Sequence, residues 1–448
     1  MAVGRRVRVC AVAVAAAVLV AGGCGGLGAS PEDAPNALTT MGFGLPDEHA
    51  TARVAVFRDR FPDTDLRINE GAFDEQQFLS AVASGEPPDL VYADRAKLGA
   101  YAARGAVEPI DDCLRSHGVD RSQFRPAAMR QVTYGGEVYG APEFATVRLL
   151  IINNTAVRAA GVDPATVSTT DWSALADLST RLADSADGRF RRIGFDPKLP
   201  DFLPLWAKAN GVELITPDGR GVRLDDPAVV ETLRYTTDLV KSQGTWAAFK
   251  AFKDGFNDFG ADNAYAKDQL AVMPMDSFYI NTLATNSPDV DLTITPFTDR
   301  QGRPVTELGG QAWAIPKGSR HPDRACDFLV TMTATDTWVT AAKARRDALA
   351  AKGRPYGGTF TANRVADEEI FTTVYASQGN RILDQGVPIV RALQDDSFAL
   401  PASPAGPDLI RAWQQAATRV LTGAQTPEEA LGQAQREADA ALDRVLGR

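Results

Sequence analysis

Residues 66–103 read LRINEGAFDEQQFLSAVASGEPPDLVYADRAKLGAYAA. The segments 66–69 and 89–92 have the composition of short strands, whereas 74–84 and 97–103 carry apolar residues at helical spacing. A glycine and a Pro-Pro pair between them suit a helix stop and a turn. Strands that alternate with helices at this spacing predict an α/β fold with a parallel sheet, whose ligand sites lie beyond the carboxyl ends of the strands.

Further elements extend this pattern in both directions. We expect a first strand at 37–41 and a helix at 51–60, and later a helix at 226–242. A strand at 269–272 is expected to end in a loop. The last helix is predicted from Thr426 to Leu446, because threonine, proline and glutamate stand at its first positions in the order of a capping box.

The length of the chain indicates its number of lobes, and its net charge disfavours certain partners. The 448 residues exceed one ordinary core, so we expect two lobes. Residues 1–23 hold three arginines and no acidic residue, which leaves 44 basic and 57 acidic residues in the rest of the chain. A net charge of −13 argues against nucleic acid and anionic lipid as partners.

The N-terminus has the pattern of an export signal. Residues 1–23 combine three arginines, an apolar run of secretory length and a small-residue end, and they are predicted to be a removed signal peptide. Cys24 follows Ala21-Gly22-Gly23, which resembles the bacterial lipobox with alanine in the usual leucine position. The expectation is lipidation at Cys24, a flexible tether over 24–36, and an extracytoplasmic protein anchored to the outer face of the membrane. An ordinary signal peptide with an incidental cysteine is the alternative.

Two cysteines remain in the mature part. Cys113 and Cys326 either form one disulfide or stay free, because the sequence does not report their separation. They and the scattered histidines have no spacing typical of a metal site, so neither a metal nor a cofactor is expected.

Four segments together resemble a known family. They are 78–91, a helix ending before a Pro-Asp strand; 105–112; 134–142 followed by 149–154; and GGQAWAIPKGS at 309–319. In this order they resemble family 1 of the bacterial extracellular solute-binding proteins. That group feeds ABC sugar importers and includes maltose-binding protein.

The resemblance implies a two-lobed clamp with a ligand cleft between the lobes, as in type II periplasmic binding proteins. Lobe one would comprise 36–145 and 297–333, and lobe two 146–296 and 334–448. A monomer would bind a carbohydrate, close about its hinge and present the ligand to the membrane permease of an ABC transporter.

Candidate ligand residues follow from the loops that the family order places at the cleft, since sugar hydroxyls bind carboxylates and amides and C–H faces pack on aromatic rings. On lobe one and the crossing they are Phe43, Phe73, Asp74, Asp94, Glu143 and Thr146. Elsewhere they are Trp206, Trp246, Asp276, Ser277, Phe278, Gly310, Gln311, Trp313 and Tyr356. Core packing is the alternative role for the aromatic residues, and helix capping for Asp74, Asp94 and Asp276.

Three functions other than sugar transport are alternatives for this chain. The same fold could bind a glycerophosphodiester, although only Arg95 and Arg354 lie in the candidate loops to meet a phosphate. A sensing or adhesion lipoprotein would have the same sequence pattern. An anchored glycoside hydrolase is disfavoured, because the adjacent aspartates do not form a facing pair and no nucleophile-elbow or zinc motif occurs. A protein that is not an enzyme is therefore expected.

Overall fold

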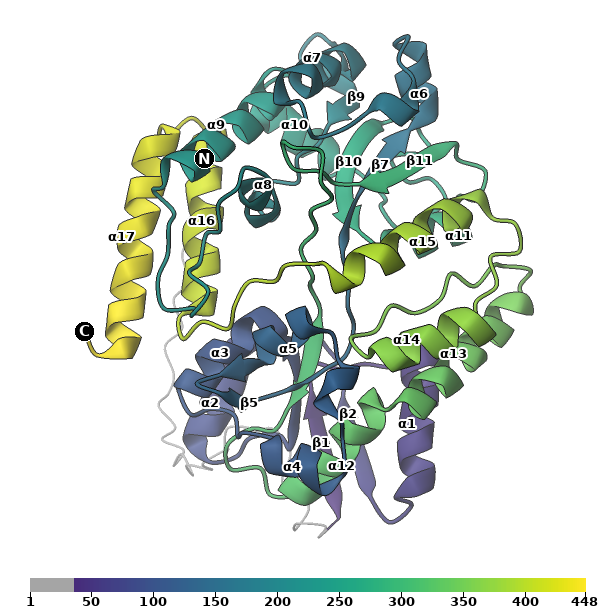
Figure 1. Cartoon of the computed structure of the whole chain (residues 1–448), viewed down its shortest axis with the longest axis vertical. Coiled ribbons are helices and arrows are strands. Elements are labelled where there is room, and N and C mark those ends of the chain that lie inside the picture. Colours follow the sequence, from purple (N-terminus) through teal and green to yellow (C-terminus); the bar gives the residue numbers. More distant parts are fainter. Residues whose placement is uncertain (1–35) are drawn as a thin grey trace, which may run out of the picture.

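The computed structural model describes residues 36–448, and the predicted signal peptide, Cys24 and nearly all of the predicted tether lie outside this range. Two α/β lobes lie one above the other, and extended segments cross between them (Figure 1). The predicted α/β fold class is confirmed, with one mixed five-stranded sheet in each lobe.

The sheet of lobe one has the order β2-β1-β3-β12-β6. Its strands are β1 (Ala37–Met41), β2 (Asp65–Asn69), β3 (Leu90–Asp94), β6 (Ala141–Pro142) and β12 (Gln311–Ala314). β1 pairs in parallel with β2 and β3, whereas β12 runs antiparallel to β3. The helical elements of this lobe are α1 (Glu48–Arg60), α2 (Glu75–Ser84), α3 (Arg95–Ala103), α4 (Asp111–Ser116), η1 (Arg121–Gln123), α5 (Pro126–Val132) and α12 (Pro322–Thr333). A short hairpin joins β4 (Thr133–Tyr134) to β5 (Glu137–Val138).

Local sequence signals set the ends of these helices. Asp74 caps α2 by accepting a hydrogen bond from the backbone N–H of Gln77, and Gly85 ends it with a left-handed φ of 78°. Helix α1 begins three residues before the predicted start at Thr51, because Asp47 caps it through the N–H of Ala50.

The sheet of lobe two has the order β11-β7-β10-β9-β8. Its strands are β7 (Arg148–Asn153), β8 (Asp184–Ala186), β9 (Arg189–Phe195), β10 (Leu270–Asp276) and β11 (Leu292–Pro296). Its helical elements are α6 (Asn154–Ala159), η2 (Pro164–Thr166), α7 (Trp172–Leu182), α8 (Leu203–Ala209), α9 (Pro227–Lys241), α10 (Trp246–Lys253) and α11 (Tyr279–Asn286). The sequence predicted a loop from Met273, but β10 continues through Asp276 because Met273 and Met275 pair with β7.

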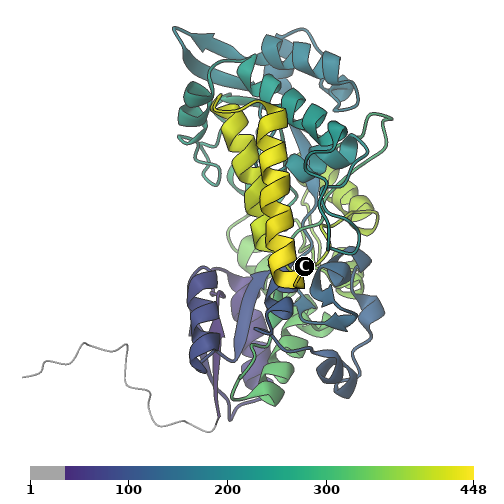
Figure 2. The same cartoon turned by 90° about the vertical axis from the view of Figure 1, so that its left-hand side faces the viewer.

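Five helices follow α12 in the chain. They are α13 (Thr335–Ala350), α14 (Arg364–Thr373), α15 (Arg381–Asp395), α16 (Gly406–Leu421) and α17 (Pro427–Leu446). The expected domain boundary gave all of residues 334–448 to lobe two, yet α13 packs against α1 and so covers lobe one. Helix α15 packs on β11 of lobe two, and the antiparallel pair α16–α17 runs along the flank of the molecule (Figure 2). Helix α16 contacts α3 of lobe one and α9 of lobe two, so this pair braces both lobes.

Three extended segments lie side by side where the chain passes between the lobes. Thr146 and Gly309 exchange backbone hydrogen bonds, and Ala145 donates its N–H to the carbonyl of Phe360. The segment around residue 145 is therefore the middle of a narrow ribbon at the hinge.

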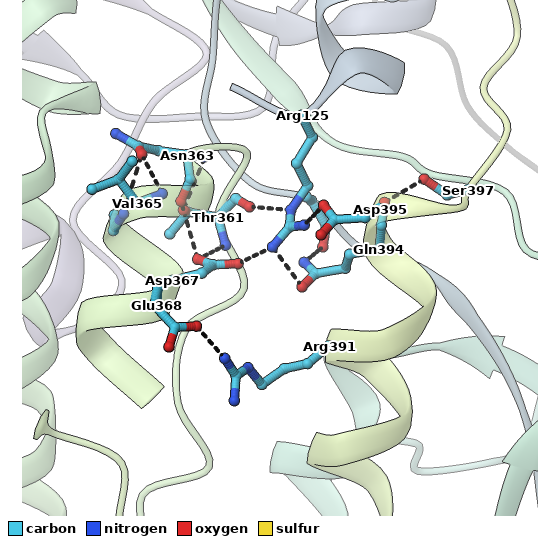
Figure 3. Close-up of polar contacts among 12 residues, drawn as sticks. Arg125, Thr361, Asn363, Val365, Asp367, Glu368, Arg391, Gln394, Asp395 and Ser397 are labelled. Atoms are coloured by element: carbon cyan, nitrogen blue, oxygen red, sulfur yellow. Dashed lines mark hydrogen bonds and ion pairs between the residues drawn. The ribbon is translucent and has the colours of Figure 1, made fainter. Parts of the chain in front are cut away.

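A buried arginine joins lobe one to the helices beyond this ribbon (Figure 3). Arg125, just before α5, donates to Asp367 Oδ2 at 2.7 Å and to Gln394 Oε1 at 2.9 Å, and it also pairs with Asp395. Thr361 donates its N–H and its hydroxyl to the other oxygen of Asp367. Both oxygens of the Asp367 carboxylate thus have hydrogen-bond partners, and the contacts of Arg125 hold α5, α14 and α15 together.

A disulfide joins Cys113 of α4 to Cys326 of α12, which answers the pairing that the sequence left open. Within the described part of the chain, no helix is long and apolar enough to cross a membrane.

Candidate functional site

A cavity of about 400 Å³ opens between the lobes beside the hinge ribbon. Both lobes and the ribbon contribute to its wall. The lining residues are Asp47, His49, Phe144, Thr146, Phe278, Asn281, Thr282, Thr285, Asn286, Arg345, Leu349, Arg354 and 355–360. This cavity lies between the lobes, where a ligand cleft is expected, and it is the candidate site.

Helix α11 presents a polar face to this cavity. Asn281 and Thr285 are four positions apart, as are Thr282 and Asn286, so the four residues share one side of the helix, while Leu283 is buried in the core. The Oδ1 atom of Asn281 is buried without a hydrogen-bond partner among the described residues. These amides and hydroxyls are donors and acceptors available to a ligand rich in hydroxyl groups.

An exposed aromatic pair stands at the start of this helix. Phe278 is 40% exposed and Phe259 is 60% exposed, and their rings stack with centroids 6.4 Å apart and an interplanar angle of 14°. The two stacked rings form a small apolar surface that is available to a ligand or partner. Phe278, one of the ligand candidates from the sequence, lines the cavity, whereas Phe259 was not singled out.

A hydrogen-bonded chain forms the lobe-one side of the cavity. The hydroxyl of Thr359 lies 2.6 Å from His49 Nε2 and 2.7 Å from the hydroxyl of Tyr356, and His49 Nδ1 lies 3.6 Å from Asp47. Burial lowers the pKa of His49, so its imidazole is neutral at pH 7. Burial disfavours ionisation of Asp47, but hydrogen bonding from His49 and from the N–H of Ala50 outweighs it and holds the pKa of Asp47 well below its usual range.

Charged side chains continue the cleft beyond Thr146. Arg148, the first residue of β7, pairs with Asp276 at the end of β10 and lies 4.5 Å from the ring of Phe202. Burial lowers the pKa of Arg148, and nearby carboxylates oppose this shift: Glu307, Asp94 and Asp201.

Lys198 lies in the same charged region. It follows β9 with a left-handed φ of 57°, which is unfavourable for a side chain with a Cβ. Within residues 36–448 its ammonium has no ion pair or hydrogen bond, and burial lowers its pKa. A strained, half-buried and unpaired lysine at the carboxyl end of a strand is a functional candidate that the sequence analysis missed. The strand before it, β9, was not predicted from the sequence, so the rule applied to the other strand ends did not reach Lys198.

Several predicted ligand residues are core residues instead. Glu143 is fully buried, pairs with Arg53 at 2.9 Å and accepts hydrogen bonds from Tyr92 and Trp313. Trp313 is fully buried, and Phe43 packs against its ring with centroids 4.8 Å apart. These side chains do not face the cavity, because the polar atoms of Glu143 and Trp313 satisfy each other inside lobe one.

The two lobe-two tryptophans also pack. Trp206 is fully buried between β9 and α7, and its indole N–H donates to the carbonyl of Pro197. Trp246, the first residue of α10, stacks on Phe249 outside the cavity lining. Neither tryptophan therefore offers the exposed ring for packing on a sugar that the sequence suggested.

Other candidates have local structural roles. Asp74 and Asp94 cap α2 and α3, and Phe73 packs on Phe78. Ser277 is buried and bonds through its N–H and its hydroxyl to the backbone of Val147.

Gly310, just before β12, has no space for a side chain. Gly310 has a φ of 145°, and a Cβ there would lie 2.3 Å from the carbonyl oxygen of Phe144. The fully buried Arg95 donates to the carbonyl oxygens of Gln311 and Phe144, so it fixes the ribbon and does not meet a ligand. Gln311 itself is exposed at the start of β12.

Three predicted residues line the cavity and a fourth lies beside it. Thr146, Phe278 and Tyr356 belong to the lining, although Tyr356 offers little surface because it bonds to Thr359. Asp276 adjoins the lining through Phe278 but is paired with Arg148. The structure therefore brings together a smaller aromatic site, centred on Phe278 and α11, than the sequence predicted.

The chain matches a known family of proteins. Residues 46–344 match the family model described as bacterial extracellular solute-binding protein. The arabinooligosaccharide-binding protein of Bacillus subtilis is 22% identical over 321 residues, which cover 69% of this chain and 72% of the relative.

Solved structures give the same fold. The solute-binding protein of an ABC transporter from Thermotoga lettingae, bound with α-D-tagatose, has a TM-score of 0.70 at 22% identity, covering 91% of this chain and 100% of that one. The GacH receptor of Streptomyces glaucescens, described unliganded and with acarbose, has a TM-score of 0.67 at 18% identity, covering 92% and 98%. With a match over two thirds of its length and a two-lobed fold around a hinge cavity, the chain belongs to the bacterial extracellular solute-binding protein family.

Proposed function

We propose that this protein is the carbohydrate-binding component of an ABC importer. It captures a sugar or oligosaccharide between its lobes and delivers it to a membrane permease. The observation that carries this proposal is the exposed ring of Phe278 in the lining of the inter-lobe cavity, beside the polar face of α11. The names of the relatives, among them an arabinooligosaccharide-binding protein, support the same ligand class.

The chemistry of the cavity suits a neutral, hydroxyl-rich ligand. Charges in its lining and on the adjacent Glu48 are balanced, because the carboxylates of Asp47 and Glu48 are matched by the guanidinium groups of Arg345 and Arg354. Amides and hydroxyls on α11 match sugar hydroxyls, and Phe278 offers an apolar ring to the C–H face of a pyranose or furanose. Binding between two lobes about a hinge favours closure, which presents the loaded form to the permease. The role is binding rather than catalysis, and the protein acts as a monomer.

Replacing Phe278 by Ala should weaken binding of the best carbohydrate at least tenfold, about 1.4 kcal/mol. The reason is the loss of a ring that packs on the sugar. The measurement is isothermal titration calorimetry with the sugar that gives the largest thermal shift in a panel of mono-, di-, oligo- and amino sugars and glycerophosphodiesters.

Val365→Ala is the matched control, because Val365 is also an exposed apolar residue, 53% exposed, and lies outside the cavity lining. Equal affinity of Phe278→Ala and the control would remove Phe278 from the site. A thermal shift by a glycerophosphodiester and by no carbohydrate would overturn the ligand class.

Lipid anchoring is part of the proposal. Cys24 lies outside the described residues, and its role rests on the sequence pattern that precedes it. A diacylated Cys24 with a tether of about a dozen residues would hold the clamp near its permease at high effective concentration.

Cys24→Ala should release the protein from the membrane fraction into the medium, while the sugar affinity of the released protein stays at the wild-type value. Immunoblots of fractionated cells test the first part, and calorimetry tests the second. Membrane retention of Cys24→Ala would show that another segment anchors the chain.

A further inference from the structure

The tertiary structure brings together three side chains whose sequence spacing gave no sign of a metal site. Cys113 and His117 lie four residues apart at the end of α4, and Cys326 lies on α12. The two sulfur atoms and a nitrogen of His117 all lie within 4.8 Å of one another. In the described structure the two sulfurs form the disulfide.

The histidine is already oriented as a ligand. Its Nδ1 lies 3.3 Å from Cys326 Sγ and 2.9 Å from the carbonyl oxygen of Cys113. Its Nε2 lies 2.9 Å from Asp327 Oδ1, and Arg324 holds the other oxygen of Asp327 at 2.9 Å. A carboxylate on the far nitrogen is the usual partner of a metal-binding histidine, because it fixes the ring and increases its basicity.

We infer that the reduced protein binds a thiophilic divalent cation such as Zn²⁺ through Cys113, Cys326 and Nδ1 of His117. Zinc sites commonly use two thiolates and an imidazole, with zinc–sulfur distances of about 2.3 Å. The three ligand atoms need only small side-chain rotations to surround one ion. The fourth position is left to water, since a groove lined by these residues and by Pro316 and Lys317 opens to the surface here.

Cation binding requires that the Cys113–Cys326 disulfide is reduced first. A dithiol reductant gives two electrons and two protons to the disulfide, which becomes two thiols, and the reductant becomes a disulfide. The cation then displaces the two thiol protons and binds Nδ1 of the imidazole, whose Nε2–H continues to donate to Asp327. The site exists only in the reduced chain and lies on lobe one, outside the lining of the inter-lobe cavity.

The test is a Co²⁺ titration of the full-length protein after reduction with a phosphine. We expect one equivalent of Co²⁺ with a sulfur-to-cobalt charge-transfer band, and displacement of Co²⁺ by Zn²⁺. The oxidised protein and the Cys326→Ser variant should show no such band. His117→Ala should weaken Zn²⁺ binding at least tenfold, and Asp327→Asn by about 10- to 100-fold. His321→Ala is the matched control, because His321 caps the same helix α12 outside the cluster and should leave the affinity unchanged.

The unfolding temperature of the reduced protein, with and without Zn²⁺, is measured in parallel. If reduction loosens the fold, Zn²⁺ should raise this temperature in the wild type and not in Cys326→Ser. Absence of a charge-transfer band, or equal affinity in the wild type and His117→Ala, would overturn the proposal. Oxidised His117→Ala should keep its sugar affinity, so the metal site and the proposed transport function fail independently.

Discussion

Replacement of Arg125 by Met is expected to lower the free energy of unfolding by about 3–5 kcal/mol. The arginine side chain is buried, and its loss leaves the buried carboxylate of Asp367 without its positive partner. The amide of Gln394 also loses a donor, although it still donates to the carbonyl oxygen of Ala145 in the hinge ribbon. Urea unfolding followed by circular dichroism measures the change.

The nearby pair Arg391–Glu368 provides the control (Figure 3). Both side chains reach solvent, and exposed ion pairs contribute about 0–1 kcal/mol. Arg391→Ala should therefore change the unfolding free energy by less than a third of the Arg125→Met effect. Equal effects of the two substitutions would show that burial at Arg125 does not determine its contribution.

Glu143→Ala is expected to lower the unfolding free energy by about 3–5 kcal/mol as well. It leaves the guanidinium of Arg53 buried in lobe one without a counterion, and it removes the acceptor for Tyr92 and Trp313. Packing of Arg53 over the ring of Trp338, 4.1 Å away, replaces only part of that interaction.

Glu437→Ala is the matched control, because Glu437 is an exposed glutamate on α17 whose carboxylate accepts a bond from Gln433. The sequence had suggested that Glu143 binds the ligand. A Glu143→Ala protein with wild-type stability and a tenfold loss of sugar affinity would support that role over the structural one.

Local signals explain why the elements of the fold were predictable. Asp74 and Gln77 are three residues apart, as are Thr426 and Glu429, so the sequence contains both partners of each helix cap. The main differences arose where pairing with a distant strand extended an element, as in β10.

The candidate site was less predictable, because burial is not a local property. Phe278 was found from its place after a strand, and it lies in the cavity. Trp313 and Glu143 had equally suitable places, yet a hydrogen bond between them, 170 residues apart in sequence, turns both into lobe one. Lys198 escaped notice because its strained backbone is visible only in three dimensions.

The sequence by itself determined the α/β class, the ends of the five helices predicted from it to within three residues, and the acidic charge, and its first 24 residues predict export and lipidation, since each depends on composition or on residues a few positions apart. Only the tertiary structure decided which side chains face the cavity, how Arg125 joins the lobes, and that Cys113, His117 and Cys326 meet. The contacts Arg125–Asp367 and Cys113–Cys326 each join residues more than 200 positions apart, which no local sequence pattern reports.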